Sequence, residues 1–222
     1  MYTQALVTSE LVSTVLALVL AYLFLRAYRL TRSSYLLGLP TGFLLLGSSY
    51  VFLGASLVFE SNVALSEQFL WLRLITQSYG FAFIAFTYYF SSKTERATKH
   101  FLSVISFASA ITILLFFVAL IVAPPFPELP SINVVDECFR IGNLVFLGYV
   151  IYHVVKRLES SHEPISGLWA PTAFSLLWLG QYSSLIWEID ASETAFVFAH
   201  AARLASLALF IRIYYSSGRV RR

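Results

Sequence analysis

The sequence contains one cysteine, Cys138, and three lysines. A single cysteine forms no disulfide within the chain and supplies no zinc or iron–sulfur site built from cysteines. The lysines are Lys93, Lys99 and Lys156, and all three fall in short polar stretches between long apolar runs. Because a retinal-binding opsin needs a Schiff-base lysine inside its seventh helix, the sequence excludes bound retinal.

Charged residues of either sign are scarce. Only 12% of the residues are charged and 58% are hydrophobic, whereas an ordinary soluble domain has roughly 25% charged residues. The mean hydropathy of +0.75 reflects repeated apolar stretches of about 20 residues, long enough to cross a hydrocarbon core of roughly 30 Å. We therefore predict a multi-pass membrane protein in contact with the lipid bilayer. Its basic residues are spread over short loops, so nucleic acid is not an expected partner.

Apolar runs bounded by charges or by Pro, Gly and Ser clusters predict an all-α fold, a bundle of seven transmembrane helices in a single domain, 1–222. The helices are expected near 9–30, 35–59, 66–91, 100–122, 134–157, 165–189 and 192–215. No Lys or Arg precedes the first run, which continues to a full span. We expect this run to be retained as a helix instead of being cleaved as a signal peptide.

The basic residues predict the orientation of the helices, because Lys and Arg near helix ends stay on the cytoplasmic side. Twelve of the 15 lie on one side of the predicted bundle: Arg26, Arg29, Arg32, Lys93, Arg96, Lys99, Lys156, Arg157, Arg212, Arg219, Arg221 and Arg222. Nine of the 12 acidic residues lie at or near the other side: Glu10, Glu60, Glu67, Glu128, Asp136, Glu137, Glu188, Asp190 and Glu193. The sequence thus predicts a cell-membrane protein with its N-terminus outside and its C-terminus in the cytoplasm.

The first three and the last three predicted helices share features offset by 127 to 132 positions. The matched pairs are Glu10 with Glu137, Tyr22 with Tyr149, Gly38 with Gly167, Phe43 with Phe174, Tyr50 with Tyr182, and Arg73 with Arg203. This pattern allows a 3+1+3 parallel internal repeat with its axis along the membrane normal. Chance matching among helices rich in Leu and Phe is the alternative.

The three remaining basic residues, Arg73, Arg140 and Arg203, fall inside predicted helices. A charge there costs about 2.5–3.5 kcal/mol unless a partner, water or a ligand compensates it. Helical spacing places other polar residues beside these arginines. The candidate ligand-binding residues are Arg73, Gln77, Glu137, Arg140, Asn143, Gln181, Glu188, His200 and Arg203. Since arginine binds carboxylate or phosphate bidentately, we expect an outward-facing pocket for a small polar or anionic ligand.

Two other interpretations of these charges remain open. Structural ion pairs would join Glu137 to Arg140 or Arg203, and Glu10 to Arg73, and would need no ligand. Alternatively, the arginine side chains extend along the helices to the membrane surface.

No cofactor, metal or enzymatic activity is expected. Haem ligation by His100 and His153 is disfavoured, since a haem needs two ligands at matched depth on facing helices and both histidines lie near cytoplasmic helix ends. The sequence also lacks the GxSxG, HExxH and Walker A motifs of hydrolytic sites.

The third predicted helix contains residues 69–80, FLWLRLITQSYG. With its short loops, many aromatic residues and external N-terminus, the chain resembles the seven-helix sensory modules that precede bacterial and archaeal histidine kinases and cyclase-type output domains. The resemblance implies a sensor or receptor-like module. Few residues follow Tyr215, so we expect a separate cytoplasmic signalling partner instead of an output domain in the chain.

Two other functions are compatible with the sequence. One is a small-solute transporter built on the 3+1+3 repeat. The other is an accessory structural subunit of a larger membrane complex, which would dock other membrane subunits, or further copies of itself, through lipid-facing aromatic residues of the third and fourth helices.

Overall fold

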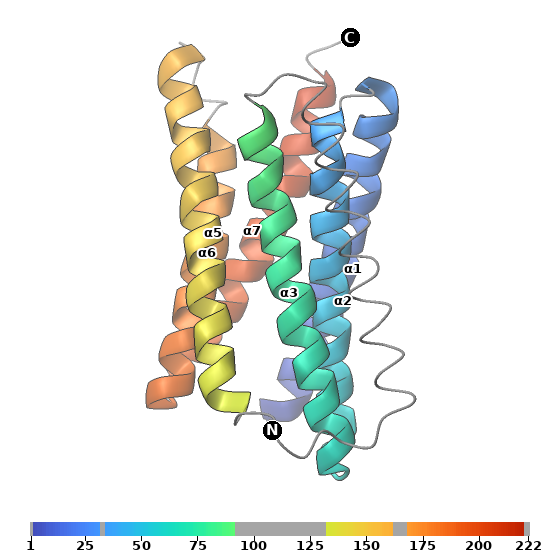
Figure 1. Cartoon of the computed structure of the whole chain (residues 1–222), viewed down its shortest axis with the longest axis vertical. Helices are drawn as coiled ribbons and strands as arrows, with labels where there is room; N and C mark the ends of the chain where they lie inside the picture. The colour runs from blue at the N-terminus through green and yellow to red at the C-terminus, as the bar shows by residue number, and fades with distance from the viewer. Residues whose placement is uncertain (1, 32–33, 92–131, 162–167, 220–222) are drawn as a thin grey trace.

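The computed structural model describes residues 2–31, 34–91, 132–161 and 168–219. Every regular element in this part of the chain is a helix, which confirms the all-α prediction (Figure 1). The helices are α1 (Tyr2–Thr31), the 3-10 helix η1 (Ser34–Leu37), α2 (Gly38–Val58), α3 (Val63–Ser91), α5 (Ile132–Ser161), α6 (Trp169–Asp190) and α7 (Glu193–Arg219). The span predicted near 100–122, including His100, lies outside the described residues.

Five of the described helices are long and apolar enough to cross a membrane, as a multi-pass membrane protein requires. Their apolar segments are Gln4–Thr31, Gly38–Val58, Val63–Ser91, Val135–Glu159 and Glu193–Ser216. Helix α6 covers most of the sixth predicted span but is not among these five. Its sequence places Gln181, Tyr182, Ser183 and Ser184 in succession, which lowers its apolar character. That the chain crosses the membrane seven times therefore stays a prediction.

Most described helices extend beyond the apolar runs that predicted them. Helix α1 begins at Tyr2 instead of near residue 9, α5 ends at Ser161 instead of near 157, and α7 ends at Arg219 instead of near 215. The reason is that backbone hydrogen bonds continue through polar flanking residues, which need not lie in lipid. Apolar runs thus predict the apolar segment of each helix but not the residues at which the helix begins and ends.

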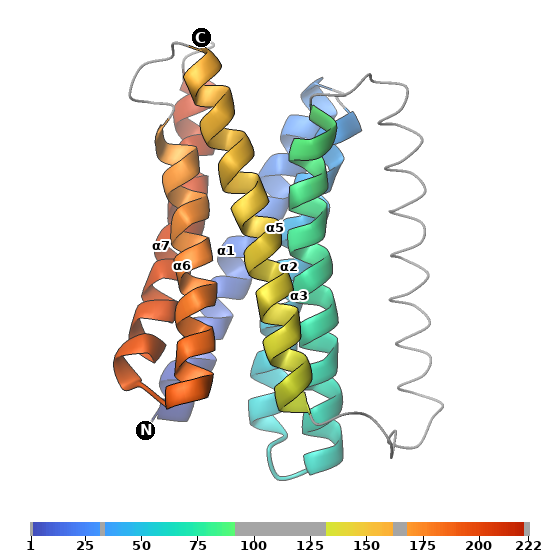
Figure 2. The same cartoon turned by 60° about the vertical axis from the view of Figure 1, so that its left-hand side comes forward.

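The six long helices form a closed ring. Contacts join α1 with α2, α2 with α3, α3 with α5, α5 with α6, α6 with α7, and α7 with α1. Figure 2 shows α6 and α7 on one side of the molecule and α2 and α3 on the other. The first three helices and the last three therefore form two groups, which meet at the α3–α5 and α1–α7 interfaces.

This grouping is compatible with a 3+1+3 repeat, but the matched residues differ in their surroundings. Glu10 is buried whereas Glu137 is exposed, and Tyr50 is buried whereas Tyr182 is exposed. Gly167 lies outside the described residues. The repeat therefore stays a prediction.

Helices α2 and α3 pack closely at two glycines. A Cβ atom added to Gly42 would lie 2.8 Å from the backbone oxygen of Gly80, closer than Cβ atoms approach in real structures. Small residues of this kind let membrane helices pack with their backbones close together. This contact holds α2 and α3 as a unit within the first group.

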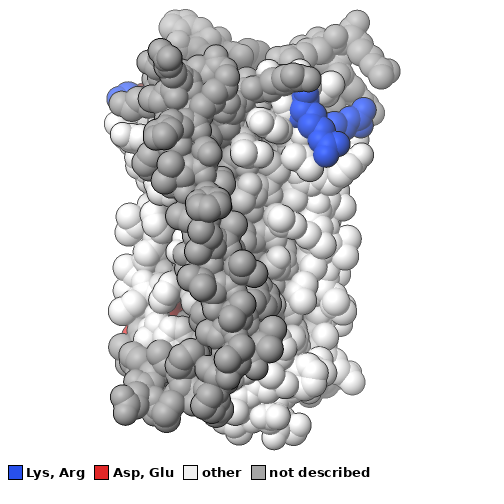
Figure 3. All heavy atoms as spheres, turned by 45° about the vertical axis from the view of Figure 1, so that its right-hand side comes forward, with Lys and Arg blue, Asp and Glu red and all other residues white. Residues whose placement is uncertain are grey.

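Charges gather at the two ends of the bundle. We call the end where α1, α3, α5 and α7 finish the basic end, and the opposite end the acidic end (Figure 1). Among the described residues, the basic end carries Arg26, Arg29, Lys156, Arg157 and Arg212, and the acidic end carries Glu60, Glu67, Asp190 and Glu193. On the face shown in Figure 3, the described atoms between the two ends are largely uncharged. Leu11, Val15 and Val145, which lie between the two ends, are more than half exposed. An apolar belt between charged ends is what a bilayer-embedded bundle requires.

Candidate functional site

A buried ion pair joins α1 to α7. Arg203 Nη2 donates to Glu10 Oε1 over 2.5 Å and to Ser9 Oγ over 3.2 Å. The guanidinium also lies over the ring of Tyr50 on α2, with its carbon 4.6 Å from the ring centroid, in a cation–π contact. Because Glu10 is only 1% exposed, the pairing is needed to offset the cost of burying both charges.

His200 approaches the same carboxylate from one turn earlier on α7. Its Nε2 lies 3.4 Å from Glu10 Oε1, and its Nδ1 lies 2.8 Å from the carbonyl oxygen of Phe196. A carbonyl oxygen only accepts hydrogen bonds, so Nδ1 carries a hydrogen. Nε2 then forms an ion pair with Glu10 whenever the ring is doubly protonated. We call Glu10, His200 and Arg203 the α1–α7 cluster.

A second ionic cluster joins α3, α5 and α6. Arg140 Nη2 donates to Asp136 Oδ2 over 3.0 Å and also to Glu188 Oε1. Arg73 Nη1 on α3 lies 3.7 Å from the same Asp136 oxygen. The Arg140 side chain is 3% exposed, whereas that of Glu188 is 25% exposed, so the cluster opens toward the acidic end through Glu188. We call these four residues the α3–α5–α6 cluster.

Helix geometry explains why each cluster forms on the inner face of its helices. Asp136 and Arg140 are four residues apart, and His200 and Arg203 are three apart, so each pair shares one face. From the acidic ends of α3, α5 and α7, a rise of 1.5 Å per residue places Arg73, Arg140 and Arg203 about 12–15 Å deep. The two clusters therefore lie at similar depth.

Both clusters line one cavity of about 270 Å³ in the acidic half of the bundle. All six long helices contribute to its wall. Its polar lining residues are Glu10, Tyr50, Arg73, Gln77, Asp136, Arg140, Gln181, Ser184, Glu188, His200 and Arg203. The rest of the wall is Leu6, Leu53, Leu57, Leu70, Leu74 and Trp187. Polar side chains from all six long helices thus converge on one space.

Seven of the nine predicted ligand-binding residues line this cavity, and Glu137 and Asn143 do not. Glu137 is exposed, because one residue along a helix is a turn of about 100° away from the inward direction of Asp136. Asn143 is 1% exposed but lies three residues beyond Arg140 in the direction of the basic end. Whether the seven bind a ligand stays a prediction.

Five lining residues with polar or aromatic side chains were absent from the predicted site: Glu10, Tyr50, Asp136, Ser184 and Trp187. The spacing of Asp136 four residues before Arg140 is a signal that places it beside this arginine, but Glu137, three residues before Arg140, carries the same signal. Tyr50, by contrast, carries no such signal, since its place beside Arg203 depends on α2 lying near α7.

The predicted ion pairs have the wrong partners. The alternative of structural ion pairs joined Glu10 to Arg73, and Glu137 to Arg140 or Arg203. Ion pairs do join the helices, but Glu10 pairs with Arg203, and Asp136 pairs with both Arg73 and Arg140. Helix α1 contacts α7, and the ring order of the helices decides these pairings.

Several buried polar atoms of the lining residues have no hydrogen-bond partner within the described part of the chain. They are the carboxylate oxygens Glu10 Oε2 and Asp136 Oδ1, the amide oxygens of Gln77 and Gln181, the Nε atoms of Arg140 and Arg203, and the Tyr50 hydroxyl. Each such group costs about 1–3 kcal/mol when it is left unmatched. These atoms are themselves fully buried, so a solute in the cavity reaches them only after the lining side chains move.

Toward the basic end, aromatic rings fill the bundle. Phe210 on α7 packs against Phe43 on α2 and Phe174 on α6, with ring centroids 5.4 and 4.7 Å apart. Tyr88 on α3 packs edge-on against Phe174 at 5.4 Å. Phe43 and Phe174 are almost fully buried. These four residues, which we call the aromatic barrier, separate the cavity from the basic end.

The site therefore combines a closed basic side with paired charges, several of them partly accessible, around a small cavity. Such a lining can hold a small polar molecule by several hydrogen bonds at once. Comparison of the chain with protein-family models, curated proteins and solved structures found no match, so any function has to be inferred from this geometry.

Proposed function

We propose that the chain is a receptor-like integral membrane protein that binds a small polar solute in the cavity at its acidic end. The observation that carries the proposal is the convergence of eleven polar side chains from six helices on one cavity of about 270 Å³. A polar lining is expensive in a membrane bundle, and polar residues inside membrane helices characteristically mark solute or ion sites.

Structural ion pairs alone do not require this arrangement. Three arginines can be neutralised by three carboxylates without any cavity, and a lining that served only to join helices would pack closely around its pairs. Here Gln77 and Gln181 contribute uncharged amides that take no part in the ion pairs, and both are 4% exposed. Both amides line the cavity, where a bound solute would lie beside them.

The distribution of charge supports an outward-facing cavity. The basic end of the bundle carries the Lys and Arg residues of the described helix ends, and the positive-inside rule assigns that end to the cytoplasm. The cavity would then face the cell exterior, with the N-terminus outside and the C-terminus inside.

A receptor needs a change of helix packing that reaches the cytoplasm. The two ion clusters lie at the α1–α7 and α3–α5 interfaces, which are the interfaces where the two helix groups meet. A solute that competes for Glu10 weakens the α1–α7 ion pair, and one that competes for Asp136 weakens the α3–α5 ion pair. Either change alters how the two helix groups pack, so the populations of the helix arrangements shift. The shift would be transmitted to a cytoplasmic partner at the basic end.

A transporter is the second candidate, because the two ion pairs between the helix groups are reciprocal. Glu10 on the first helix of one group meets Arg203 on the third helix of the other, and Asp136 on α5 meets Arg73 on α3 in the same manner. Repeats related in this way support alternating access. The aromatic barrier would have to open for transport. Uptake of the solute into proteoliposomes is expected of a transporter and not of a receptor, so this measurement distinguishes the two candidates.

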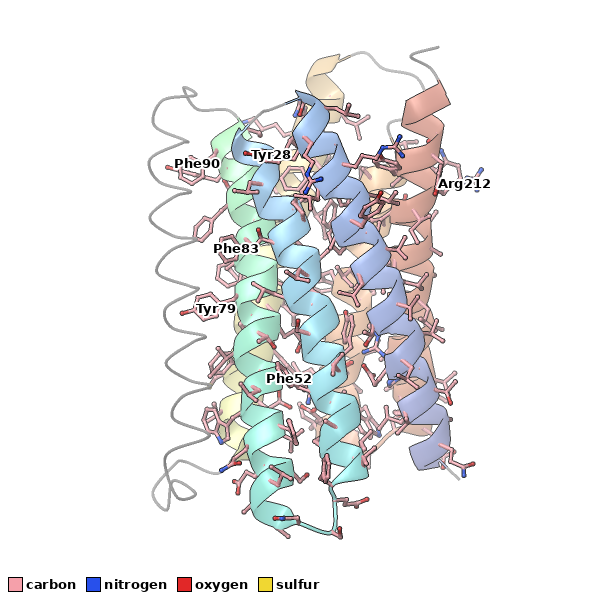
Figure 4. The ribbon with its side chains drawn as sticks, turned by 90° about the vertical axis from the view of Figure 1, so that its right-hand side faces the viewer. Tyr28, Phe52, Tyr79, Phe83, Phe90 and Arg212 are labelled. Atoms are coloured by element: carbon pink, nitrogen blue, oxygen red, sulfur yellow. The ribbon has the colours of Figure 1, made fainter. Side chains whose placement is uncertain are left out.

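An accessory subunit that docks through aromatic residues of α3 receives less support. Figure 4 shows Tyr79, Phe83 and Phe90 along α3. Phe83 is 1% exposed and Phe90 is 6% exposed. Two of these three side chains are therefore buried instead of facing lipid.

The test uses the purified chain in lipid nanodiscs and a metabolite extract of the host cells, with thermal stability as the readout. A solute that binds the folded state raises Tm with increasing concentration. We expect the extract to stabilise the native chain, and Gln77→Leu and Gln181→Leu to abolish the effect while folding normally. Mass spectrometry of the retained molecules then identifies the solute.

Asn143→Leu is the matched control, because it also replaces a buried amide but one that does not line the cavity. It should keep the stabilisation by the extract. If no fraction of the extract stabilises the native chain, or if both glutamine variants respond as the native chain does, the proposal is wrong.

A further inference from the structure

The imidazole of His200 lies between two hydrogen-bond acceptors. Its Nδ1 is 2.8 Å from the carbonyl oxygen of Phe196, and its Nε2 is 3.4 Å from Glu10 Oε1. The Glu10 carboxylate also accepts a hydrogen bond from Arg203, as an ionised carboxylate does. A carbonyl oxygen and an ionised carboxylate only accept. Both ring nitrogens of His200 therefore need a hydrogen to donate.

Only the cationic form of the ring satisfies both contacts. A neutral imidazole carries one hydrogen, and its other nitrogen holds a lone pair. With the hydrogen on Nδ1, the lone pair of Nε2 faces the Glu10 carboxylate. With the hydrogen on Nε2, the lone pair of Nδ1 faces the Phe196 carbonyl oxygen instead. Each neutral form thus turns one of the two contacts from attractive to repulsive.

Packing holds the His200 ring in this position, and the cavity gives it access to water. The ring lies 4.3 Å from the Phe196 ring, centroid to centroid, and Phe196 packs against Trp187 on α6 at 5.0 Å. The ring therefore does not turn away without displacing aromatic neighbours. The His200 side chain is 15% exposed and lines the cavity, so water in the cavity can exchange protons with it.

The charged and ionisable neighbours of His200 come from its own helix and from the helices around it. Glu10 on α1 contacts His200 directly, and Arg203 on α7 contacts the same Glu10 oxygen. Tyr50 on α2 lies with its ring against the Arg203 guanidinium, and Glu188 on α6 lines the same cavity. A protonated His200 places a second positive charge near that of Arg203. The Tyr50 ring face and the two carboxylates attract these cations.

We infer that His200 is a proton sensor that controls the contact between α1 and α7. Histidine ordinarily changes its charge between pH 5 and 8. At low pH the cationic ring donates to Glu10 and fastens α7 to α1. As the pH rises, the ring loses a proton, this contact becomes repulsive and the interface loosens. The two helix groups meet at this interface, so the charge of one side chain shifts how the groups pack.

The inference needs no bound solute and stands apart from the proposed function. It concerns a contact within the chain, and its tests are made without the metabolite extract. In the orientation that the basic residues predict, the cavity faces the cell exterior. His200 would then respond to the pH outside the cell.

The first measurement follows the charge of the ring. The chain has four histidines, and replacing the other three with glutamine leaves His200 as the only imidazole in a nitrogen NMR spectrum of the chain in nanodiscs. The nitrogen chemical shift distinguishes a protonated ring nitrogen from one with a lone pair. We expect both nitrogens to carry hydrogen at about pH 5, and one of them to have lost it at about pH 8. A ring with the same charge at both values overturns the inference.

The second measurement follows the distance between α1 and α7. Spin labels are attached at Thr8→Cys and Thr194→Cys, which replace exposed residues of the two helices, in a Cys138→Ser background. Between about pH 5 and about pH 8 we expect the distance distribution to broaden toward longer distances. The change should be absent in His200→Gln, because glutamine has no proton to lose in this range.

Two controls separate this response from other effects of pH. His153→Gln removes a histidine of α5, outside the α1–α7 cluster, and should keep the response. Labels at Val58→Cys and Glu67→Cys, exposed on α2 and α3, join helices of one group and should show no change. A constant α1–α7 distance in the chain with native His200, or a response that persists in His200→Gln, overturns the inference. If His200→Gln fails to fold, the NMR spectrum and the distances in the chain with native His200 still decide.

Discussion

Glu10 and Arg203 lie 193 positions apart in the sequence and form a buried ion pair with 2.5 Å between Oε1 and Nη2. The pair fastens the first helix of the chain to the last described one. Arg73 and Asp136 join α3 to α5 in the reciprocal sense, with 3.7 Å between the charged groups. Both contacts between the two helix groups thus carry an ion pair at the wall of the cavity.

The coupling between Glu10 and Arg203 is testable by a double-mutant cycle. Glu10→Gln and Arg203→Gln each leave one buried charge without its partner, so each should lower the free energy of unfolding by about 3–5 kcal/mol. The double variant should lose less than the sum of the two losses, because no unpaired charge remains. Denaturant titration in micelles measures all three variants. Strictly additive losses would show that the two side chains do not interact.

Asp136 and Glu137 are adjacent acidic residues with opposite surroundings. Asp136→Asn removes a charge that Arg73 and Arg140 share, and we expect a loss of several kcal/mol. Glu137→Gln removes the same charge from an exposed position, and we expect a change within about 0.5 kcal/mol. Unfolding experiments on the two variants under identical conditions compare them. Equal losses would contradict the inward orientation of Asp136.

The packing of α2 on α3 predicts opposite effects for two glycines of one helix. Alanine is favoured over glycine in a helix by about 1 kcal/mol, so Gly54→Ala, where a Cβ meets nothing within 4 Å, should leave Tm unchanged or raise it. Gly42→Ala should lower Tm, because its Cβ meets the Gly80 carbonyl oxygen and the Ile84 side chain. A Gly42→Ala variant as stable as Gly54→Ala would show that the two helices are not in close contact.

The orientation in the membrane is testable by labelling single cysteines in a Cys138→Ser background. Ser61, between α2 and α3, and Ser216, near the end of α7, are both exposed. The positive-inside rule predicts that a membrane-impermeant maleimide labels Ser61→Cys in intact cells, and labels Ser216→Cys only after permeabilisation. The opposite labelling pattern would place the cavity on the cytoplasmic side.

Much of the architecture could be predicted from local patterns. Apolar runs of membrane length determine six described helices to within a few residues at most ends, and the charges between them predict which helix ends lie together. The same patterns identified Arg73, Arg140 and Arg203 as buried charges, because a basic residue inside an apolar run is rare enough to be noticed singly.

The partners of those charges could not be predicted in this way. One interpretation of the sequence placed Glu10 beside Arg73, because nothing local says that α1 closes the ring against α7. A difference of one position separates Asp136, which is buried, from Glu137, which is exposed, and only the packed helix decides which of the two faces inward.

The sequence by itself therefore determined that the chain forms apolar helices of membrane length. It also identified Arg73, Arg140 and Arg203 as the charged side chains inside these helices. These properties follow from composition and from periodicity along one helix, which are local. The tertiary structure alone decided that six helices bring these residues to one cavity and that Glu10 and Asp136 each meet an arginine of the other helix group. Such contacts depend on the order of helices around the ring, which is set by the packing of side chains far apart in the sequence.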